Sequence, residues 1–119
     1  VIDMITSDHN LIDIEHKKVE YSVAKFGTIG LESLFGALNK VLPLETLITC
    51  LTTKPKDRFG IKNASIYEGG KANLTLFNPD IETVFTKDAI LSTSKNSVFL
   101  NKKMNGKVYG IIANNKVVL

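Results

Sequence analysis

The sequence predicts a chain of the α/β class, in which one strand and several helices precede a part made only of strands. With 119 residues, of which 44% are hydrophobic, the chain has the length of one domain and enough apolar side chains for a core. Apolar residues recur at helical spacing up to about Gly60, and beyond it they alternate with polar residues. We therefore expect the helices in residues 1–60 and a β-rich part in residues 61–119.

The first nine residues predict a short buried strand that runs into a polar cluster. Apolar side chains dominate "VIDMI", and "SDHN" follows at positions 7–10. Almost nothing precedes this cluster that would complete a site around Asp8 and His9. Residues 10–30 then predict a long irregular connection, and such loops inside compact domains are usually functional.

Three helices are expected between residues 31 and 60. The first has an apolar stripe at helical spacing, which consists of Leu31, Leu34, Phe35, Leu38 and Leu42. Pro43 breaks the chain and suits the start of a second helix, which carries apolar residues on one face as far as Leu51. A short third helix is expected in "TKPKDRFG", with Gly60 as its C-terminal stop.

The β-rich part begins with a predicted pair of strands. A Gly-Gly turn at residues 69–70 separates a strand in "ASIYE", residues 64–68, from a strand over residues 72–76. Apolar and polar residues alternate in the second strand, which is the period of a half-buried strand. Asn78-Pro79-Asp80 predicts the turn that ends it.

The end of the chain carries a strong hairpin signal. A weaker strand is predicted first, over residues 83–91. In "KVYGIIANNKVVL", Asn114 and Asn115 separate two apolar runs. Both asparagines can adopt positive φ, as a two-residue type I′ turn requires.

Charge and cysteine content exclude several classes of protein. The net charge is +3 and the basic residues are spread along the chain, so they form no nucleic-acid footprint. No apolar run is long enough to span a bilayer and no signal-peptide pattern is present, so we expect no membrane association. The single cysteine, Cys50, excludes an internal disulfide and fits a reducing cytoplasm. Its apolar helical surroundings favour a small core residue over a nucleophile.

Six short strings follow one another along nearly the whole chain. They are "TSDHN", "KFGTIGLES", "LTTKPKDRFGI", "EGGKANLTLFNPD", "STSKNSVF" and "NGKVYGIIANNKVV". In order and approximate spacing they resemble the C-terminal part of dihydroorotase, a member of the amidohydrolase superfamily. Each string alone is weak, but six in order are specific for cyclic amidohydrolases of this type, which include dihydropyrimidinase and allantoinase. The phrase "FGTIGLES" favours dihydroorotase.

The resemblance implies a fold for each part of the chain. Residues 1–60 would be the last strand, the substrate loop and the C-terminal helices of a TIM-type (β/α)8 barrel. Residues 61–119 would be most of the small β-sandwich domain that flanks this barrel. We therefore expect a C-terminal fragment, whose missing strands complete the barrel and the sandwich. Unpaired strand edges invite pairing with another chain, so the isolated fragment is expected to form a homodimer or to aggregate.

The resemblance also implies a function, the reversible cyclisation of N-carbamoyl-aspartate to dihydroorotate in pyrimidine biosynthesis. By motif match, Asp8 binds the metal centre and acts as general base toward the hydrolytic water, at the strand end where barrel active sites lie. Phe26 and Gly27 match the backbone that contacts the dihydroorotate ring. Two plainer interpretations stay open: Asp8 and His9 as a loop-capping pair, and Gly27 with Gly30 as turn residues.

One position departs from the family's pattern, Asp-His-Ala-Pro-His, whose last histidine contacts the substrate carboxylate. Here the stretch is "DHNLI", which puts Leu11 at the proline position and Ile12 at the histidine position. Isoleucine has no hydrogen-bond donor on its side chain. Either another group binds the carboxylate, or the substrate differs, or activity has been lost. His16 is a candidate substitute, with a solvent-exposed histidine beside two lysines as the alternative.

Most of the family's metal ligands are missing from this chain. The family uses a His-x-His, a carboxylated lysine and two further histidines, whereas the chain has only His9 and His16. Two metal ions need several ligands, and Asp8 alone supplies one. We expect zinc in the intact enzyme, but not held by this chain alone, which should be inactive by itself.

Two features of the sequence, Ile12 and the β-rich part, also fit other functions. Ile12 motivates both a catalytically inactive dihydroorotase-like subunit, kept with aspartate transcarbamoylase, and a related cyclic amidohydrolase of the dihydropyrimidinase or allantoinase type. The β-rich part motivates an independent interaction module. For the leading hypothesis, the expected partners are the small-molecule substrate and the rest of the barrel.

Overall fold

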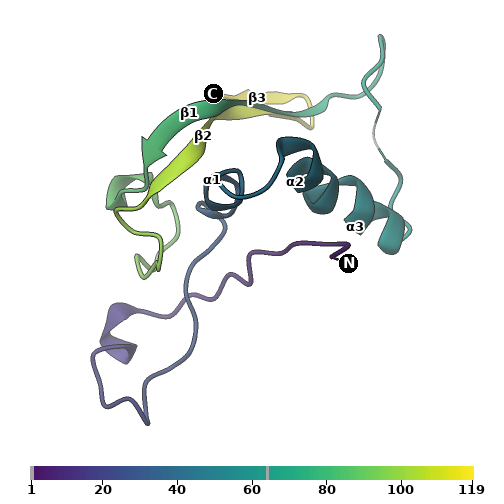
Figure 1. The fold of residues 1–119 in the computed structure, drawn as a ribbon. Helices are drawn as coiled ribbons and strands as arrows, with labels where there is room; N and C mark the ends of the chain where they lie inside the picture. Colours follow the sequence, from purple (N-terminus) through teal and green to yellow (C-terminus); the bar gives the residue numbers. More distant parts are fainter. Residues whose placement is uncertain (1, 64) are drawn as a thin grey trace.

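A three-stranded sheet lies over a row of short helices in the computed structural model, which describes residues 2–63 and 65–119 (Figure 1). Val1 and Ala64, at the starts of two predicted strands, lie outside the described residues. The chain extends over 56 × 30 × 28 Å and its radius of gyration is 16.5 Å. A compact domain of this length has a radius of about 13–14 Å, so this chain is more open than most.

The helical region agrees with the sequence at its second and third helices. Helix α2 spans Leu44–Leu51 and begins after Pro43, and helix α3 spans Thr53–Arg58. The chain leaves α3 through Gly60 at a φ of 66°, as the predicted C-terminal stop requires. No helix in the described part of the chain is long and apolar enough to cross a bilayer.

The first predicted helix is much shorter than the apolar stripe suggests. Helix α1 spans Leu34–Leu38, and turns replace a helix on either side of it. Leu31, which the stripe includes, is 63% exposed. The helix packs its Gly36 against Met104, where a Cβ on the glycine would come within 3.0 Å. The position of this helix therefore depends on its close contact with the sheet, and the apolar stripe alone does not predict its length.

The sheet is antiparallel with the strand order β1–β2–β3, which Figure 1 shows above the helices. Strand β1 spans Asn73–Val84, β2 spans Lys103–Ala113 and β3 spans Lys116–Val118. The predicted C-terminal hairpin is confirmed, because Asn114 and Asn115 join β2 to β3 at φ values of 51° and 59°.

The predicted turn at Asn78-Pro79-Asp80 is wrong, since these residues lie inside β1. They form an irregularity at which the pairing with β2 shifts register between Asn78 and Glu82. Proline lacks an N–H, and it is tolerated where β1 lies at the edge of the sheet and leaves the ladder. The side-chain amide of Asn39 replaces the missing ladder contact, because it donates to the carbonyls of Pro79 at 2.8 Å and Asn105 at 3.0 Å.

Two further strand predictions differ from the structure. Residues 65–68 have no strand, so the predicted partner of residues 72–76 is replaced by β2. Of residues 83–91, the first two end β1 and Lys87–Ala89 form a short 3-10 helix. Short apolar runs carry little information about their partners, and here pairing with the long β2 determines which run becomes a strand.

The segment before the long loop also lacks the predicted strand, because residues 2–13 form no ladder. This segment runs past the end of α2 instead. The N–H of Ile5 donates to the carbonyl of Cys50 at 3.3 Å, and Cys50 is buried as predicted. A central strand forms only where neighbouring strands offer hydrogen-bond partners, and none of the described strands lies beside this segment.

The core joins the loop region to the sheet. It consists of Ile29, Phe85, Ile90 and Met104, with Ala37 and Leu100 packed against it. Ile29, which is 1% exposed, comes from the long loop between residues 10 and 30. Its burial anchors the end of this loop against β2 and the segment that follows β1.

Candidate functional site

The polar cluster at residues 7–10 lies directly beside the end of the long loop. The N–H of Asn10 donates to the carbonyl of Thr28 at 3.0 Å, and its side-chain amide approaches the carbonyl of Phe26 at 3.5 Å. Gly30 is buried so close that a Cβ on it would lie 2.6 Å from the carbonyl oxygen of Ser7. The structure therefore brings the strand-end cluster and the candidate substrate loop together, as the motif order predicts.

His9 holds the two segments together through its ring. The Nδ1 atom accepts hydrogen bonds from the N–H groups of Gly30 at 3.1 Å and Leu31 at 3.2 Å. An imidazole nitrogen that accepts carries no proton, so the neutral ring has its proton on Nε2. The loop-capping interpretation thus applies to His9.

Asp8 has a different environment from its neighbour. Its φ of 44° turns the backbone sharply, and its N–H donates to the Thr6 hydroxyl at 3.2 Å. The residue is exposed, and its carboxylate makes no hydrogen bond or ion pair with any described residue. An Asp in the left-handed region is uncommon and is held there by the surrounding chain. The carboxylate is free for a ligand or a proton.

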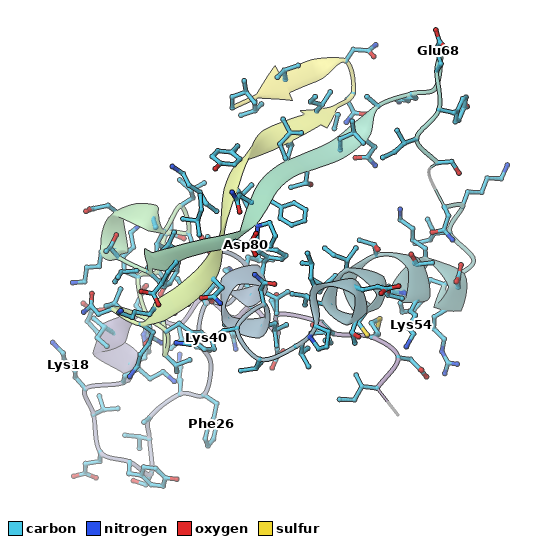
Figure 2. The ribbon with its side chains drawn as sticks, turned by 45° about the horizontal axis from the view of Figure 1, so that its top comes forward. Lys18, Phe26, Lys40, Lys54, Glu68 and Asp80 are labelled. Carbon is cyan, nitrogen blue, oxygen red and sulfur yellow. The ribbon has the colours of Figure 1, made fainter. Side chains whose placement is uncertain are left out.

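Phe26 and Gly27 occupy the outer part of the loop. The Phe26 side chain is 87% exposed, and Figure 2 shows it pointing away from the helices and the sheet. Gly27 has a φ of 133°, and a Cβ there would lie 2.8 Å from atoms of both Asn10 and Ile12. Glycine is therefore required at this position for backbone conformation and for space.

The residues that hold the loop from its other side were not predicted as site residues. The Asn96 carbonyl accepts from the N–H of Ile29 at 3.0 Å and from the Thr28 hydroxyl at 3.2 Å. The Asn96 side-chain amide donates to the carbonyl of Gly27 at 3.3 Å. Ser94, which is 2% exposed, donates to the carbonyl of Ile12 at 2.9 Å. Both residues belong to the string "STSKNSVF", which was one of the six motif matches and so was the available signal.

Glu32, just after the long loop, makes a second link between the loop and the segment that contains Ser94 and Asn96. Its Oε1 accepts hydrogen bonds from the N–H of Ser92 at 2.8 Å and from the Ser92 hydroxyl at 2.5 Å. Burial acts to raise the pKa of the Glu32 carboxyl, but the hydrogen bonds that the carboxylate accepts, chiefly those from Ser92, outweigh it. The pKa of Glu32 is therefore below its ordinary value.

The other candidates of the sequence lie apart from this arrangement. His16 is exposed at the end of the 3-10 helix Ile14–His16, within the long loop. Ile12 is half-buried beneath Gly27 and offers no donor. Among the described residues, no group of three or more His, Cys, Asp or Glu side chains could hold a metal ion. The described residues therefore do not fit a complete metal centre.

Curated dihydroorotases are similar to nearly the whole of this chain. The protein of Geotalea daltonii is 36% identical over 98% of the chain, that of Chlorobaculum tepidum 32% over 99%, and that of Bacillus subtilis 34% over 98%. The matched part is 29%, 28% and 28% of those proteins, so the chain spans less than a third of their length. No protein-family model matches the chain.

Solved structures of hydantoinases share the fold. A D-hydantoinase superimposes with a TM-score of 0.79 at 20% identity, and a D-hydantoinase (dihydropyrimidinase) from Thermus sp. with a TM-score of 0.82 at 19% identity. Each match covers 98% of this chain and 28% of the other. The resemblance that the six strings carry is therefore confirmed: over 98% of its length the chain is homologous to the C-terminal part of dihydroorotases, with a fold also found in these two hydantoinases.

Proposed function

We propose that this chain is the C-terminal part of a dihydroorotase, which reversibly cyclises N-carbamoyl-aspartate to dihydroorotate. The observation that carries the proposal is the 36% identity to a dihydroorotase across 98% of the chain. The placement proposed is the last strand, substrate loop and helices of the barrel for residues 1–60, and part of the flanking β-sandwich for residues 61–119. Pyrimidine biosynthesis in the cytoplasm is the setting proposed with it.

Asp8 is the proposed general base. Its carboxylate is exposed and makes no contact with another described polar group, so it can accept a proton from the hydrolytic water and return it to the leaving nitrogen. The next two residues, His9 and Asn10, are hydrogen-bonded to Gly30 and Thr28, so the backbone beside Asp8 is held against the end of the substrate loop. A general base needs this combination of a fixed backbone and an open carboxylate.

Phe26 and Gly27 are the proposed substrate contacts, through their backbone. Their carbonyls already accept from the side-chain amides of Asn10 and Asn96. Within the described residues, the Gly27 N–H donates to no acceptor. An N–H is the group that a carbonyl or carboxylate of dihydroorotate would accept from.

Zinc is the proposed metal, and Asp8 is its proposed ligand from this chain. The described residues do not form a metal centre by themselves, so the other ligands must come from the rest of an amidohydrolase barrel. The open shape of the chain supports a partner of this kind. Large apolar side chains such as Ile2, Val108 and Val117 are 71%, 54% and 61% exposed. Such surfaces pack against further protein, either the barrel or the second copy of a homodimer.

The test is an assay of the full protein that contains this chain, with zinc supplied, for ring opening of dihydroorotate. Asp8→Ala is expected to lower kcat by at least about 100-fold, because it removes the base. Asp88→Ala, another exposed aspartate, is the matched control and should keep wild-type kinetics. Full activity of the Asp8→Ala variant would refute its role.

A second function is favoured by one observation, the isoleucine at position 12. A side chain without a donor suits a neutral ring, as in a hydantoin or dihydropyrimidine, better than the carboxylate of dihydroorotate. A substrate panel of dihydroorotate, dihydrouracil and hydantoin separates the two. Loss of all three activities, in a protein that lacks the remaining metal ligands, would indicate an inactive dihydroorotase-like subunit.

A further inference from the structure

We propose that Asn96 is a positioning residue for the substrate loop, so that a segment far along the chain sets the affinity for the substrate. This inference rests on the proposed function, because it assumes that the backbone of Phe26 and Gly27 contacts the substrate. It assigns a role to the string "STSKNSVF", to which the proposed function gives none.

The first step of the argument is the density of contacts around this one residue. Asn96 accepts from the Ile29 N–H and the Thr28 hydroxyl through its carbonyl, and it donates to the Gly27 carbonyl through its side chain. These contacts engage three consecutive residues of the loop. The Thr28 hydroxyl also accepts from the N–H of Val98 at 3.3 Å, which ties the loop to the same segment again.

The second step is that Asn96 is itself held in place. Its N–H donates to the hydroxyl of Ser94 at 3.2 Å, and that hydroxyl donates to the Ile12 carbonyl at 2.9 Å. Ser94 is 2% exposed, so this connection is shielded from water. Ser94 thus links Ile12, near the start of the loop, to the segment that contains Asn96, and Asn96 contacts Gly27 near the end of the loop.

The third step concerns Gly27, whose conformation the amide of Asn96 selects. At a φ of 133° a glycine has many alternatives, because it lacks the Cβ that would restrict it. Asn10 contacts the neighbouring Phe26 carbonyl from one side and Asn96 contacts the Gly27 carbonyl from the other. With both carbonyls engaged, the Gly27 N–H has one defined direction. Removing the Asn96 donor frees the Gly27–Thr28 peptide, and with it the backbone angles of Gly27, without touching the reacting atoms.

Asn96→Asp is the sharpest test, since the side chain keeps its shape and loses its donor. In the full protein, with dihydroorotate as substrate, we expect KM to rise about 3- to 10-fold, the effect of one hydrogen bond, with kcat within about twofold. The control is Asn73→Asp, which adds the same charge at an exposed asparagine whose side chain makes no hydrogen bond with described residues. Unchanged KM in Asn96→Asp would overturn the proposal, and so would an equal rise in the control.

A second readout keeps the inference separate from the proposed function. Amide hydrogen exchange at residues 27–31 should be faster in Asn96→Asp than in the wild type, while exchange in α2 stays the same. If wild-type protein does not turn over dihydroorotate, the proposed function fails, and slow exchange at residues 27–31 in Asn96→Asp then overturns the positioning role as well. If Asn96→Asp does not fold, Ser94→Ala replaces it, with a smaller rise in KM expected and an unchanged KM refuting the proposal.

Discussion

The carboxylate of Glu32 accepts two hydrogen bonds from Ser92, one from the backbone and one from the hydroxyl, although 60 positions separate the residues. Glu32 directly follows the loop residues that His9 caps, and Ser92 begins the segment that contains Asn96. The pair therefore joins the end of the substrate loop to the segment that contains Asn96. The pKa of Glu32 falls below its ordinary value, because these hydrogen bonds outweigh the effect of burial that raises it.

Replacing Glu32 with glutamine should make stability less dependent on acid pH. A carboxyl whose pKa is lowered by folding stabilises the protein above the unfolded pKa, about 4.3, and this contribution disappears as the pH falls through the folded value. We expect Glu32→Gln to lower the free energy of unfolding by about 0.5–1 kcal/mol at pH 7, after allowance for solvent screening. The difference from wild type should be smaller at pH 3 than at pH 7, because the contribution is lost as the carboxyl takes up a proton. Urea unfolding at both pH values measures it, with the exposed Glu68→Gln as control. Equal losses at both pH values would contradict the prediction.

Gly30→Ala should damage both the fold and the candidate site. The new methyl group would lie 2.6 Å from the carbonyl oxygen of Ser7, which is too close for any carbon atom. Relief requires the chain before Asp8 to move, so we expect a loss of about 1–3 kcal/mol in stability and a clear loss of activity. Thermal unfolding and steady-state kinetics measure the two effects. Gly69→Ala is the comparison, because its methyl group would meet no atom within 4 Å and only its positive φ adds strain. Native stability and activity in Gly30→Ala would disprove the close approach.

Asn39→Ala should destabilise the junction between α1 and the sheet. The substitution removes the amide that donates to the carbonyls of Pro79 and Asn105 at the irregular part of β1. We expect a loss of about 1–3 kcal/mol in the free energy of unfolding, measured with urea. The control Asn63→Ala removes an exposed hydrogen bond to Asp57 and should change stability by less than about 0.5 kcal/mol. A similar effect in both variants would show that the Asn39 contacts add nothing to the fold.

The parts of the fold that the sequence predicted correctly depend on local chemistry. Pro43 and Gly60 delimit the region of α2 and α3, and the two asparagines at residues 114–115 determine the last turn. Asn78-Pro79-Asp80 is chemically a turn as well, and the Asp80 N–H does donate to the Asn78 side chain at 2.9 Å. Here the pairing of β1 with β2 on both sides of the triplet overrides the local preference, and this pairing leaves no local signal.

The candidate site was predictable only in part for the same reason. The motif match named Asp8, Phe26 and Gly27, and the structure places the neighbours of Asp8 against the loop that contains the other two. Asn96 was missed because its role arises from contacts between distant segments, and a lone asparagine between Lys95 and Ser97 has no periodicity to reveal it. A residue that belongs to a local motif can be recognised in the sequence. A residue that acts by contacting a distant segment can be recognised only once the fold is known.

The hydrogen bond between Asn96 and Gly27 spans 69 positions, which has a consequence for the order of folding. Contacts between such distant residues form late, because the loop that they close must first lose its entropy. During synthesis, the helices can form as soon as they emerge from the ribosome. The stretch around Gly27 can form its hydrogen bonds with residues 96–98 only after those residues have been made. The candidate substrate loop would thus acquire its final conformation late, after residues 96–98 have been made.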